Sequence, residues 1–409
     1  MTTTVTSQGF LLGEISLDAM SKSPHPKHPT RVALVVPTWN AGARWPAWIA
    51  GVKSQVLRAV PVGAEPRGRL GIDLSVWVVD SHSSDHTVAL SRSAGFEVLS
   101  LGEQTFSHGG TRQWAVEQVL ERSRAWGQPA PEFVVLMTQD AVLASEEALC
   151  ELLAPFADPA VGAVYGRQLP HTDATLLAAQ ARFFNYPPEG ASRSLEDRAR
   201  LGIRAAFCSD SFAAYRLSHF LAVGGFPRQV IMGEDMWVAG QLLLSGFKVA
   251  YAPRAMVEHS HNYSWLEEFQ RYVDTGVFHA QAPWLLEKFG GVGSEGLQML
   301  KAQLSWAGQA SLEALGLGPD KSGEHQTQQA QQEQQALPTA TAVLRSLERT
   351  RLQVEAMRSS PRTRILFVAQ VLLSLGAKGL GYRVGRAHHW LPRALLERLS
   401  ALKGFWTER

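Results

Sequence analysis

Cysteine is scarce in this chain of 409 residues, which contains only Cys150 and Cys208. Two cysteines cannot build the disulfide framework of a small secreted domain, and they leave a zinc site short of sulfur ligands. Residues 1–20 also lack the basic start and the long apolar run of a cleavable targeting segment. We therefore expect a protein of the reducing cytoplasm.

Long hydrophobic runs are missing as well. The longest apolar stretch near the C-terminus, Ile365 to Leu375, is interrupted by Gln370 and Ser374 and is shorter than the ~20 residues of a membrane-spanning helix. A net charge of +2 gives little general attraction for nucleic acid. We expect a chain that neither crosses a bilayer nor binds nucleic acid.

The common glycine-rich phosphate motifs are not matched either. Gly109 and Gly110 precede a predicted helix, but their segment fits neither G-x-x-x-x-G-K nor a clean G-x-G-x-x-G. The helix start could still attract an anion, and Arg112 could clamp a phosphate with two hydrogen bonds. A plain loop without a ligand is the alternative.

What the sequence does contain is a regular alternation of β-rich runs and helical patterns. Strands are predicted at Val32–Val36, Leu74–Val79, Glu97–Leu101 and Phe133–Met137, with helices at 44–55, after Ser84 and from about Thr111. This spacing predicts parallel βαβ units of an α/β fold. Ligands of such open sheets bind outside the carboxyl ends of the strands, so the residues that follow each strand are site candidates.

Composition divides the chain into five parts. We predict a loose leader at 1–30, an α/β domain at 31–285, a helical extension at 286–315, a Gln-rich linker at 316–341 and a basic, amphipathic helical tail at 342–409.

Polar residues follow the first two predicted strands. Pro37 bends the chain after the first strand, and Thr38 and Asn40 present hydrogen-bonding groups there. Asp80 ends the second strand, where a carboxylate can accept the imide N–H of uracil or thymine. The alternative is that this turn only caps the next helix, as Ser and Asp often do.

A metal site is indicated by Asp140, which follows the strand Phe133–Met137. A carboxylate there can hold Mg²⁺ or Mn²⁺ together with the phosphates of a substrate. Its neighbour is Gln139 rather than a second acid, so another ligand is needed. His259 and His261 share one face if their segment is extended. A purely structural role for this histidine pair is the alternative.

A further acidic pair, Glu234 and Asp235, opens a helix that ends near Ser245. The helix dipole would keep Asp235 ionised at neutral pH. Acidic residues also stabilise first turns without any catalytic role. Trp237 in the same turn could stack on a sugar ring or fill the core.

Together these segments resemble the glycosyltransferase family 2 enzymes of the GT-A fold, and among them the bacterial rhamnosyltransferases of surface polysaccharide biosynthesis. The late segment GYRVGRAHHWLPRALLERLS also resembles the tail of that group. The matching stretches occur in the family's order: VVPTWNAG, VVDSHSSDHT, FSHGGTRQWA, LMTQDAVL, VGAVYGRQLP, FFNYP, FCSDSFAAYR, VGGFP, GEDMWVA, GFKVAYAP and VEHSHNYS.

The resemblance implies a Rossmann-like mixed open sheet flanked by helices, a nucleotide-diphosphate sugar donor, and Mg²⁺ or Mn²⁺. Asp235 would be the catalytic base. Donor contacts fall on Pro37, Thr38, Asn40, Asp80, Ser83, Arg112, Gln139 and Asp140, metal contacts on Asp140 and His259, and acceptor contacts on Glu234, Trp237, Ser209 and Asp210. The subgroup shares Gln139, whereas Asp210 stands where it usually has Asn.

The reaction implied is inverting transfer of a sugar, L-rhamnose from dTDP-L-rhamnose, to a hydroxyl of a lipid-linked saccharide. A UDP-hexose donor and a non-catalytic nucleotide-sugar-binding scaffold remain open. The presence of Asp140 and Asp235 argues against the scaffold. A nucleotidyltransferase would need a basic triphosphate loop, and residues 37–42 contain no Lys or Arg.

The tail from Arg351 onward carries eleven Lys or Arg against three Glu and no Asp. Basic residues here flank an apolar stripe, which is typical of an interfacial helix. The stripe consists of Ile365, Leu366, Val368, Leu372 and Leu375. It predicts either peripheral contact with the inner face of the cytoplasmic membrane or packing against the protein's own core.

Overall fold

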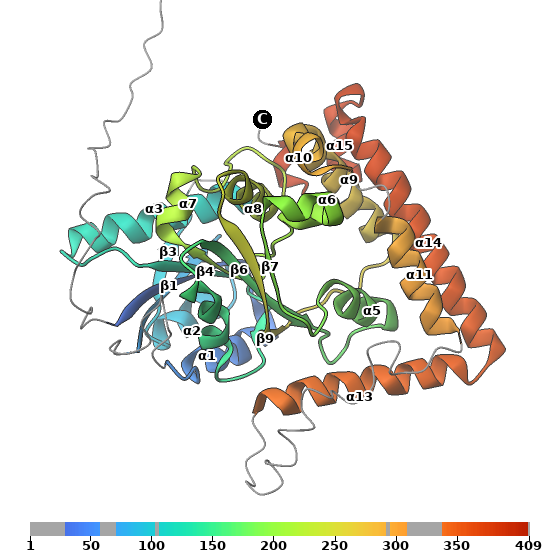
Figure 1. Ribbon diagram of the computed structural model, residues 1–409, viewed down its shortest axis with the longest axis horizontal. Coiled ribbons are helices and arrows are strands. Elements are labelled where there is room, and N and C mark those ends of the chain that lie inside the picture. Colours follow the sequence, from blue (N-terminus) through green and yellow to red (C-terminus); the bar gives the residue numbers. More distant parts are fainter. Residues whose placement is uncertain (1–28, 58–70, 103–105, 292–294, 309–337, 408–409) are drawn as a thin grey trace, which may run out of the picture.

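A computed structural model describes residues 29–57, 71–102, 106–291, 295–308 and 338–407. The predictions for the leader and for most of the Gln-rich linker fall on residues outside these ranges. The helices of the last range form an arm beside a compact α/β body, and the long α14 runs along its outer side (Figure 1).

Nine strands of the described residues form one mixed sheet, in the order β3-β2-β1-β4-β8-β6-β9-β5, with β7 paired to β9. Strands β3, β2, β1 and β4 are parallel, as the sequence predicts, whereas β8 lies antiparallel between β4 and β6. Their bounds are β1 Thr30–Thr38, β2 Ile72–Asp80, β3 Glu97–Ser100, β4 Phe133–Met137, β5 Val142–Leu143, β6 Val161–Leu169, β7 Ala191–Arg193, β8 Phe212–Arg216 and β9 Lys248–Glu258. This mixed open sheet is the predicted fold class.

Helices cover both faces of the sheet. α1 and α4 pack with one core cluster, and α3 and α8 pack with the other. The helices are α1 Trp45–Lys53, α2 Thr87–Ser93, α3 His108–Ala125, α4 Ala148–Leu153, α5 Leu176–Asn185, α6 Arg198–Leu201, α7 Leu217–Ala222, α8 Glu234–Leu244, α9 Trp265–Gln281, α10 Pro283–Phe289, α11 Glu295–Ala307, α13 Pro338–Arg358, α14 Pro361–Arg386, α15 Arg393–Leu399 and α16 Gly404–Thr407.

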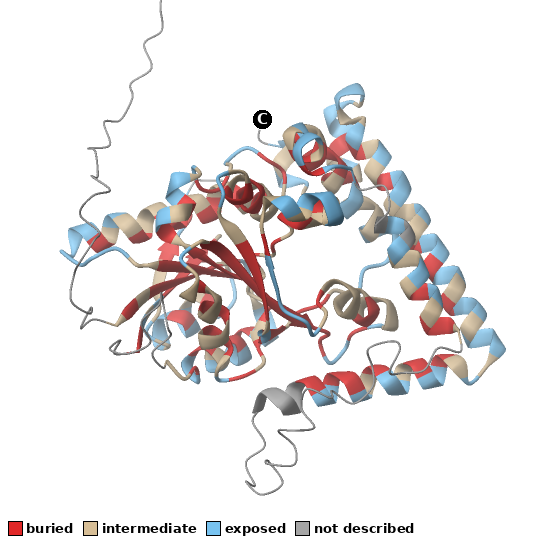
Figure 2. Cartoon of the chain, in the orientation of Figure 1, coloured by how far each residue is buried: buried red, intermediate tan, exposed pale blue. Residues whose placement is uncertain are grey.

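Strand β1 shows why the sheet is buried between these layers. Val32, Leu34 and Val36 belong to the core on one face, and Ala33 and Val35 belong to the core on the other. A strand buried on both faces needs a continuous apolar run, because successive side chains point to opposite faces. The central strands are accordingly buried along their length in Figure 2.

The arm is attached to the body by close packing of α14 on α9. Gly276 of α9 faces Gly385 of α14, and a Cβ on either residue would meet the backbone of the other helix. Gly381 approaches the carbonyl of Phe269 in the same way. Beyond α15, Asp274 of α9 accepts hydrogen bonds from the Ser400 hydroxyl at 2.6 Å and from two backbone N–H groups. The tail is therefore joined to the α/β body.

Helix α14 extends beyond the apolar run that the sequence shows. Its 26 residues are long and apolar enough, by length and composition, to cross a membrane, although the apolar run seen in the sequence is short. Two polar residues do not end a helix, so the regular structure extends well past Ile365–Leu375. About a fifth of its most apolar window (22%) is buried inside the molecule. Phe367 and Val371 pack inward, while Leu372 and Leu373 are exposed.

Candidate active site

The first part of the site is built by the turns after β1 and β2. Asp80 is buried at the end of β2, where its Oδ1 accepts a hydrogen bond from Thr38 Oγ1 at 3.2 Å and its Oδ2 accepts one from Ser83 N–H at 3.0 Å. Helix α2 begins only at Thr87, whose N–H donates to Asp85 Oδ1 at 2.9 Å. Asp80 therefore orders the turn after β2, and Asp85 orders the helix start.

Two polar clamps hold the β1 turn in place. Ser83 Oγ accepts from Asn40 N–H at 2.8 Å, and Asn40 Oδ1 accepts from Ser84 N–H at 2.8 Å. Gln139 binds both backbone groups of Trp39: its Oε1 accepts from the N–H at 2.8 Å, and its Nε2 donates to the carbonyl at 3.1 Å. A carboxylate at position 139 could accept the first of these hydrogen bonds but could not donate the second. This explains structurally why Gln rather than an acid stands at position 139.

These turns border a cavity of about 390 Å³ beyond the carboxyl ends of β1, β2 and β4. Asp80 accepts a hydrogen bond from the lining residue Thr38, but neither Asp80 nor Asn40 lines the cavity itself. The cavity is lined by Pro37, Thr38, Trp39, Ser81, Phe106, His108, Arg112, Thr138 and Gln139.

The glycine pair before α3 serves packing. A Cβ on Gly109 would collide with the Pro227 carbonyl, and one on Gly110 would collide with the Ser107 hydroxyl. That hydroxyl caps α3 by accepting from Gly110 N–H at 3.1 Å. Both glycines therefore permit close approach at a capped helix start, which explains them without a phosphate.

Arg112 lies on the buried side of α3, among carboxylates. Its Nη1 donates to Glu234 Oε1 at 2.5 Å, and its Nε lies 3.7 Å from Asp210 Oδ2. All three side chains are almost fully buried. Burial disfavours the charge of Arg112, but Glu234 and Asp210 outweigh it, and its pKa is raised. Arg112 also lines the cavity.

Asp235 is half-buried in the first turn of α8, which starts after Gly233 in a left-handed conformation (φ 76°). Its Oδ1 accepts from Met236 N–H at 2.7 Å, and its Oδ2 has a longer contact of 3.4 Å with Asp210 N–H. Burial and the charge of Glu234 raise the pKa of Asp235 to about 7. Burial and Glu234 therefore oppose the effect of the helix dipole, which by itself favours the ionised carboxylate.

The residues predicted to contact the acceptor occupy different surroundings. Ser209 faces the catalytic cleft and accepts a hydrogen bond from Gln168 Nε2 at 2.9 Å. Asp210 is buried, and its Oδ1 accepts from Tyr215 Oη at 2.7 Å. Trp237 packs edge-on against Trp284, with ring centroids 5.2 Å apart, and does not line the cleft. Its position matches the core alternative.

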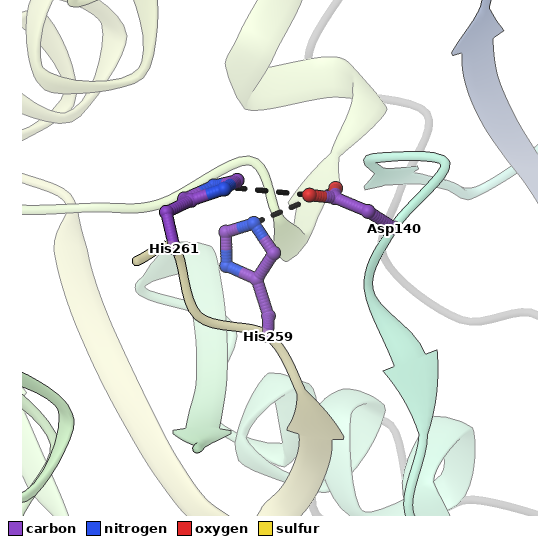
Figure 3. Close-up of side chains that lie close together, drawn as sticks. All are labelled: Asp140, His259 and His261. Carbon is purple, nitrogen blue, oxygen red and sulfur yellow. Dashed lines mark ion pairs between the residues drawn. The ribbon is translucent and has the colours of Figure 1, made fainter. Parts of the chain in front are cut away.

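Asp140, His259 and His261 come together as a possible metal-ligand triad, with ligand atoms within 4.8 Å of one another (Figure 3). His259 Nε2 lies 3.5 Å from Asp140 Oδ1, and His261 Nε2 lies 3.7 Å from Asp140 Oδ2. Burial would raise the pKa of Asp140, but the hydrogen bond and charge of His259 hold it well below its usual range. Burial and the nearby His259 lower the pKa of His261 to about 4, which leaves a neutral imidazole at physiological pH.

Neighbouring groups orient the triad. Gln168 Oε1 lies 2.9 Å from His259 Nδ1, so the ring donates there and turns the lone pair of Nε2 toward Asp140. His171 Nε2 contacts the Asp140 carbonyl at 3.1 Å. The triad fits a divalent cation, because one carboxylate and two imidazoles can each offer one ligand atom and these atoms lie close together.

Asp235 and the triad face the same cleft, which measures about 540 Å³. Several of its wall residues escape sequence reasoning: Gln168, Arg182, Arg271, Ala401 and Leu402. They come from β6, α5, α9 and the segment after α15, so no short motif connects them to Asp140 or Asp235. The HSH spacing is the signal that does point to His261.

Comparisons with known proteins identify the family of this chain. The model of the family described as "Glycosyltransferase like family 2" matches residues 28–273. The O-antigen chain rhamnosyltransferase RfbN of Salmonella typhimurium is 40% identical over 379 residues, which cover 92% of this chain and 96% of that protein. The O-antigen chain rhamnosyltransferase WbaN of Salmonella anatum is 42% identical over 376 residues, 91% of this chain and 95% of that protein.

Among solved structures, the mannosyltransferase PcManGT from Pyrobaculum calidifontis, in complex with GDP-Man and Mn²⁺, is 17% identical with a TM-score of 0.48 and covers 89% of this chain and 90% of that one. The extent of the family match and the identity to both relatives make this chain a member of glycosyltransferase family 2, and a glycosyltransferase.

Proposed function

We propose that this enzyme transfers L-rhamnose from dTDP-L-rhamnose to a hydroxyl of a lipid-linked saccharide, with inversion at the anomeric carbon, in cell-surface polysaccharide biosynthesis. The single observation that carries the proposal is the identity of 40% and 42% to two O-antigen chain rhamnosyltransferases, each over more than nine-tenths of the chain. The arrangement of the cleft supports it, because one free carboxylate faces a triad able to hold a metal.

In the proposed reaction Asp235 removes the proton of the acceptor hydroxyl. Its Oδ2 has only a long contact with Asp210 N–H, so this oxygen is available to the substrate. A pKa of about 7 suits a general base at neutral pH. Glu234 and Asp210 are engaged by Arg112, so neither is free to act as a second, nucleophilic carboxylate. One free base is what an inverting displacement requires.

On the donor side, the cavity bordered by Thr38 and Gln139 would hold the nucleotide, with Asp80, Asn40 and Ser83 shaping its wall. Arg112 would contact the diphosphate from the boundary between cavity and cleft, since it lines both. A divalent cation held by Asp140, His259 and His261 would neutralise the charge that develops on the leaving nucleotide diphosphate. Two imidazole nitrogens suit Mn²⁺ better than Mg²⁺, which prefers oxygen ligands.

The test is to titrate the purified enzyme with dTDP-rhamnose, UDP-glucose, UDP-galactose and GDP-mannose, with and without Mn²⁺, and to measure donor turnover. We expect turnover of dTDP-rhamnose that depends on Mn²⁺. If the enzyme prefers a UDP-hexose, the proposed donor changes from dTDP-L-rhamnose to that sugar nucleotide. Asp80 permits both, because an aspartate can accept the imide N–H of thymine or of uracil. Donor binding without turnover in the presence of acceptor would instead support the scaffold alternative.

The metal assignment has its own test. Replacing His261 with Ala should raise the Mn²⁺ concentration for half-maximal activity by about tenfold or more, since loss of a residue that only orients a metal ligand already costs about 10–100-fold in metal affinity. His82→Ala is the control, because His82 lies in the β2 turn and contacts the Gly102 carbonyl. An unchanged Mn²⁺ requirement would remove His261 from the proposed metal site.

We further propose that the enzyme works at the inner face of the cytoplasmic membrane, attached peripherally through α14. The exposed leucines of this helix and the basic residues near both of its ends support the proposal. A lipid-linked acceptor would then be presented beside the catalytic cleft.

A further inference from the structure

A second hollow opens beside the catalytic cleft, bounded by α5, α9, α11 and α14. It measures about 410 Å³. Five residues line both spaces and therefore form the junction between them: Arg182, Asn185, His261, Tyr263 and Arg271. Farther out, the hollow is lined by Leu176, Met299 and Leu373, so its chemistry changes from cationic at the junction to partly apolar beside α14.

Two cations at the junction lack a carboxylate partner within ion-pair distance among the described residues. Arg182 Nη1 donates to Gln168 Oε1, while its buried Nε has no hydrogen-bond partner. The guanidinium of Arg271 lies over the Tyr263 ring, 5.0 Å from its centroid. Burial and the charge of Arg271 lower the pKa of Arg182. The two positive charges are thus close enough to repel each other.

The other cations of this region already have carboxylate partners. Arg112 pairs with Glu234 and lies near Asp210, and Lys378 pairs with Glu268 at 2.9 Å. Arg182 and Arg271 therefore have unused charge and unused N–H donors. Phosphate oxygens are the acceptors that arginine binds best, because the planar guanidinium forms two parallel hydrogen bonds. Two such groups at one junction match a diphosphate.

The pair lies outside the nucleotide cavity. Neither arginine lines the nucleotide cavity beyond β1, β2 and β4, whereas both line the cleft that contains Asp235. Resting on the function proposed above, we propose that Arg182 and Arg271 bind the diphosphate of a lipid-diphosphate-linked saccharide acceptor. Its sugar reaches Asp235 on one side of the junction, and its lipid leaves through the hollow toward Leu373 and the exposed leucines of α14.

Binding tests the site independently of catalysis. Farnesyl diphosphate is titrated into the full-length enzyme by calorimetry, with EDTA present so that no metal holds the phosphates. The wild type should bind it, and Arg182→Gln and Arg271→Gln should each weaken binding by about tenfold or more, since each loses charge-assisted hydrogen bonds. Arg204→Gln is the matched control, because Arg204 lies over Phe184 of α5 but lines neither space.

Two results would overturn the assignment. One is that the wild type does not bind farnesyl diphosphate, and the other is that both variants bind it with the same affinity as the wild type. Arg271 is exposed, so its replacement tests the site even if Arg182→Gln fails to fold. A parallel titration with dTDP and Mn²⁺ examines the donor. The affinity of both variants for dTDP should stay within about twofold of the wild type. A tenfold loss would indicate that the arginines bind the donor diphosphate and would contradict the proposal.

Transfer assays then separate this inference from the proposed function. With a prenyl-diphosphate monosaccharide as acceptor, both variants should raise the acceptor KM about tenfold or more, whereas with the matching alkyl glycoside their KM should equal that of the wild type. If no nucleotide sugar supports transfer, the proposed function fails while the calorimetry still decides the site. If transfer occurs and the variants raise KM equally for both acceptors, the diphosphate assignment fails while the proposed function stands.

Discussion

At the scale of single residues, the site depends on how three carboxylates share one guanidinium. Asp210, Glu234 and Asp235 lie around Arg112, so the cluster has more negative than positive charge. Arg112 is held between Glu234 and Asp210, and Asp235 remains as the carboxylate with an accessible oxygen. Burial, together with the negative charge of Glu234, explains why Asp235 holds its proton more tightly than a helix-start carboxylate normally does.

Replacing Asp235 with Asn should abolish transfer while leaving donor binding nearly unchanged. The amide keeps the shape and the hydrogen bond from Met236 N–H but cannot accept the proton of the acceptor. Because a positioned base contributes ~10²–10⁴-fold, turnover should fall by that factor. Steady-state kinetics and dTDP titration measure the two quantities. Turnover within about tenfold of the wild type would exclude Asp235 as the base.

The pH profile should report the same group. A base acts only when deprotonated, so kcat/KM should fall as the pH decreases through about 7, the pKa of Asp235. Glu234→Gln removes a negative charge that raises this pKa and should move the midpoint to lower pH. Glu117→Gln, which removes a surface partner of Arg228, should leave it in place. If the midpoint stays the same in Glu234→Gln, the pH dependence of kcat/KM does not report the pKa of Asp235.

The same cluster shows what a sequence can and cannot predict about a site. The sequence predicts that Thr38, Asp80 and Asp140 lie at one edge of the sheet, because parallel strands bring their carboxyl ends together. The pairing of Arg112 with Glu234 joins residues 122 positions apart, and local patterns say nothing about such partners. The helix dipole of α8 was visible in the sequence, but the larger effects of burial and of Glu234 on Asp235 were not.

At the scale of elements, the packing of α14 on α9 is the least predictable part of the fold. The four parallel strands follow from apolar runs, whereas the two-residue β5 and three-residue β7 are too short to produce a pattern. For α14 the sequence is compatible with membrane contact and with core packing. The helix has one buried side, with Phe367 and Val371, and one exposed side, with Leu372. Glycines at 276, 381 and 385 allow the close contact.

Gly385→Ala should therefore destabilise the protein. Its Cβ would collide with the Val273 carbonyl and lie 2.9 Å from Gly276 Cα, and overpacking of this kind costs about 1–3 kcal/mol. Gly376→Ala in the same helix has open space around its Cβ and should be neutral or stabilise by up to about 1 kcal/mol through helix propensity. Chemical denaturation measures both changes. Equal stability of the two variants would show that the close α9–α14 contact does not form in solution.

At the scale of the whole molecule, the arm lies next to the catalytic body and exposes one long face of α14 (Figures 1 and 2). Leu372 and Leu380 of this face are 53% and 60% exposed. Basic residues such as Arg362 and Arg383 stand near the two ends of the helix. Apolar side chains beside cationic ones are the arrangement by which a helix lies in the surface of an anionic bilayer.

Flotation with anionic vesicles tests this arrangement. The wild type should float with the vesicles. The double variant Leu372→Ser and Leu380→Ser should have a vesicle partition coefficient lower by about tenfold or more, since burying each leucine in the bilayer contributes ~1.5–3 kcal/mol. The control is Leu90→Ser combined with Leu221→Ser, which removes two exposed leucines from the catalytic body and should not change flotation. Raising the salt concentration should weaken the wild-type interaction by screening the basic residues. If both double variants float like the wild type, the exposed face of α14 does not attach the enzyme to the membrane, and the acceptor must reach the cleft in another way.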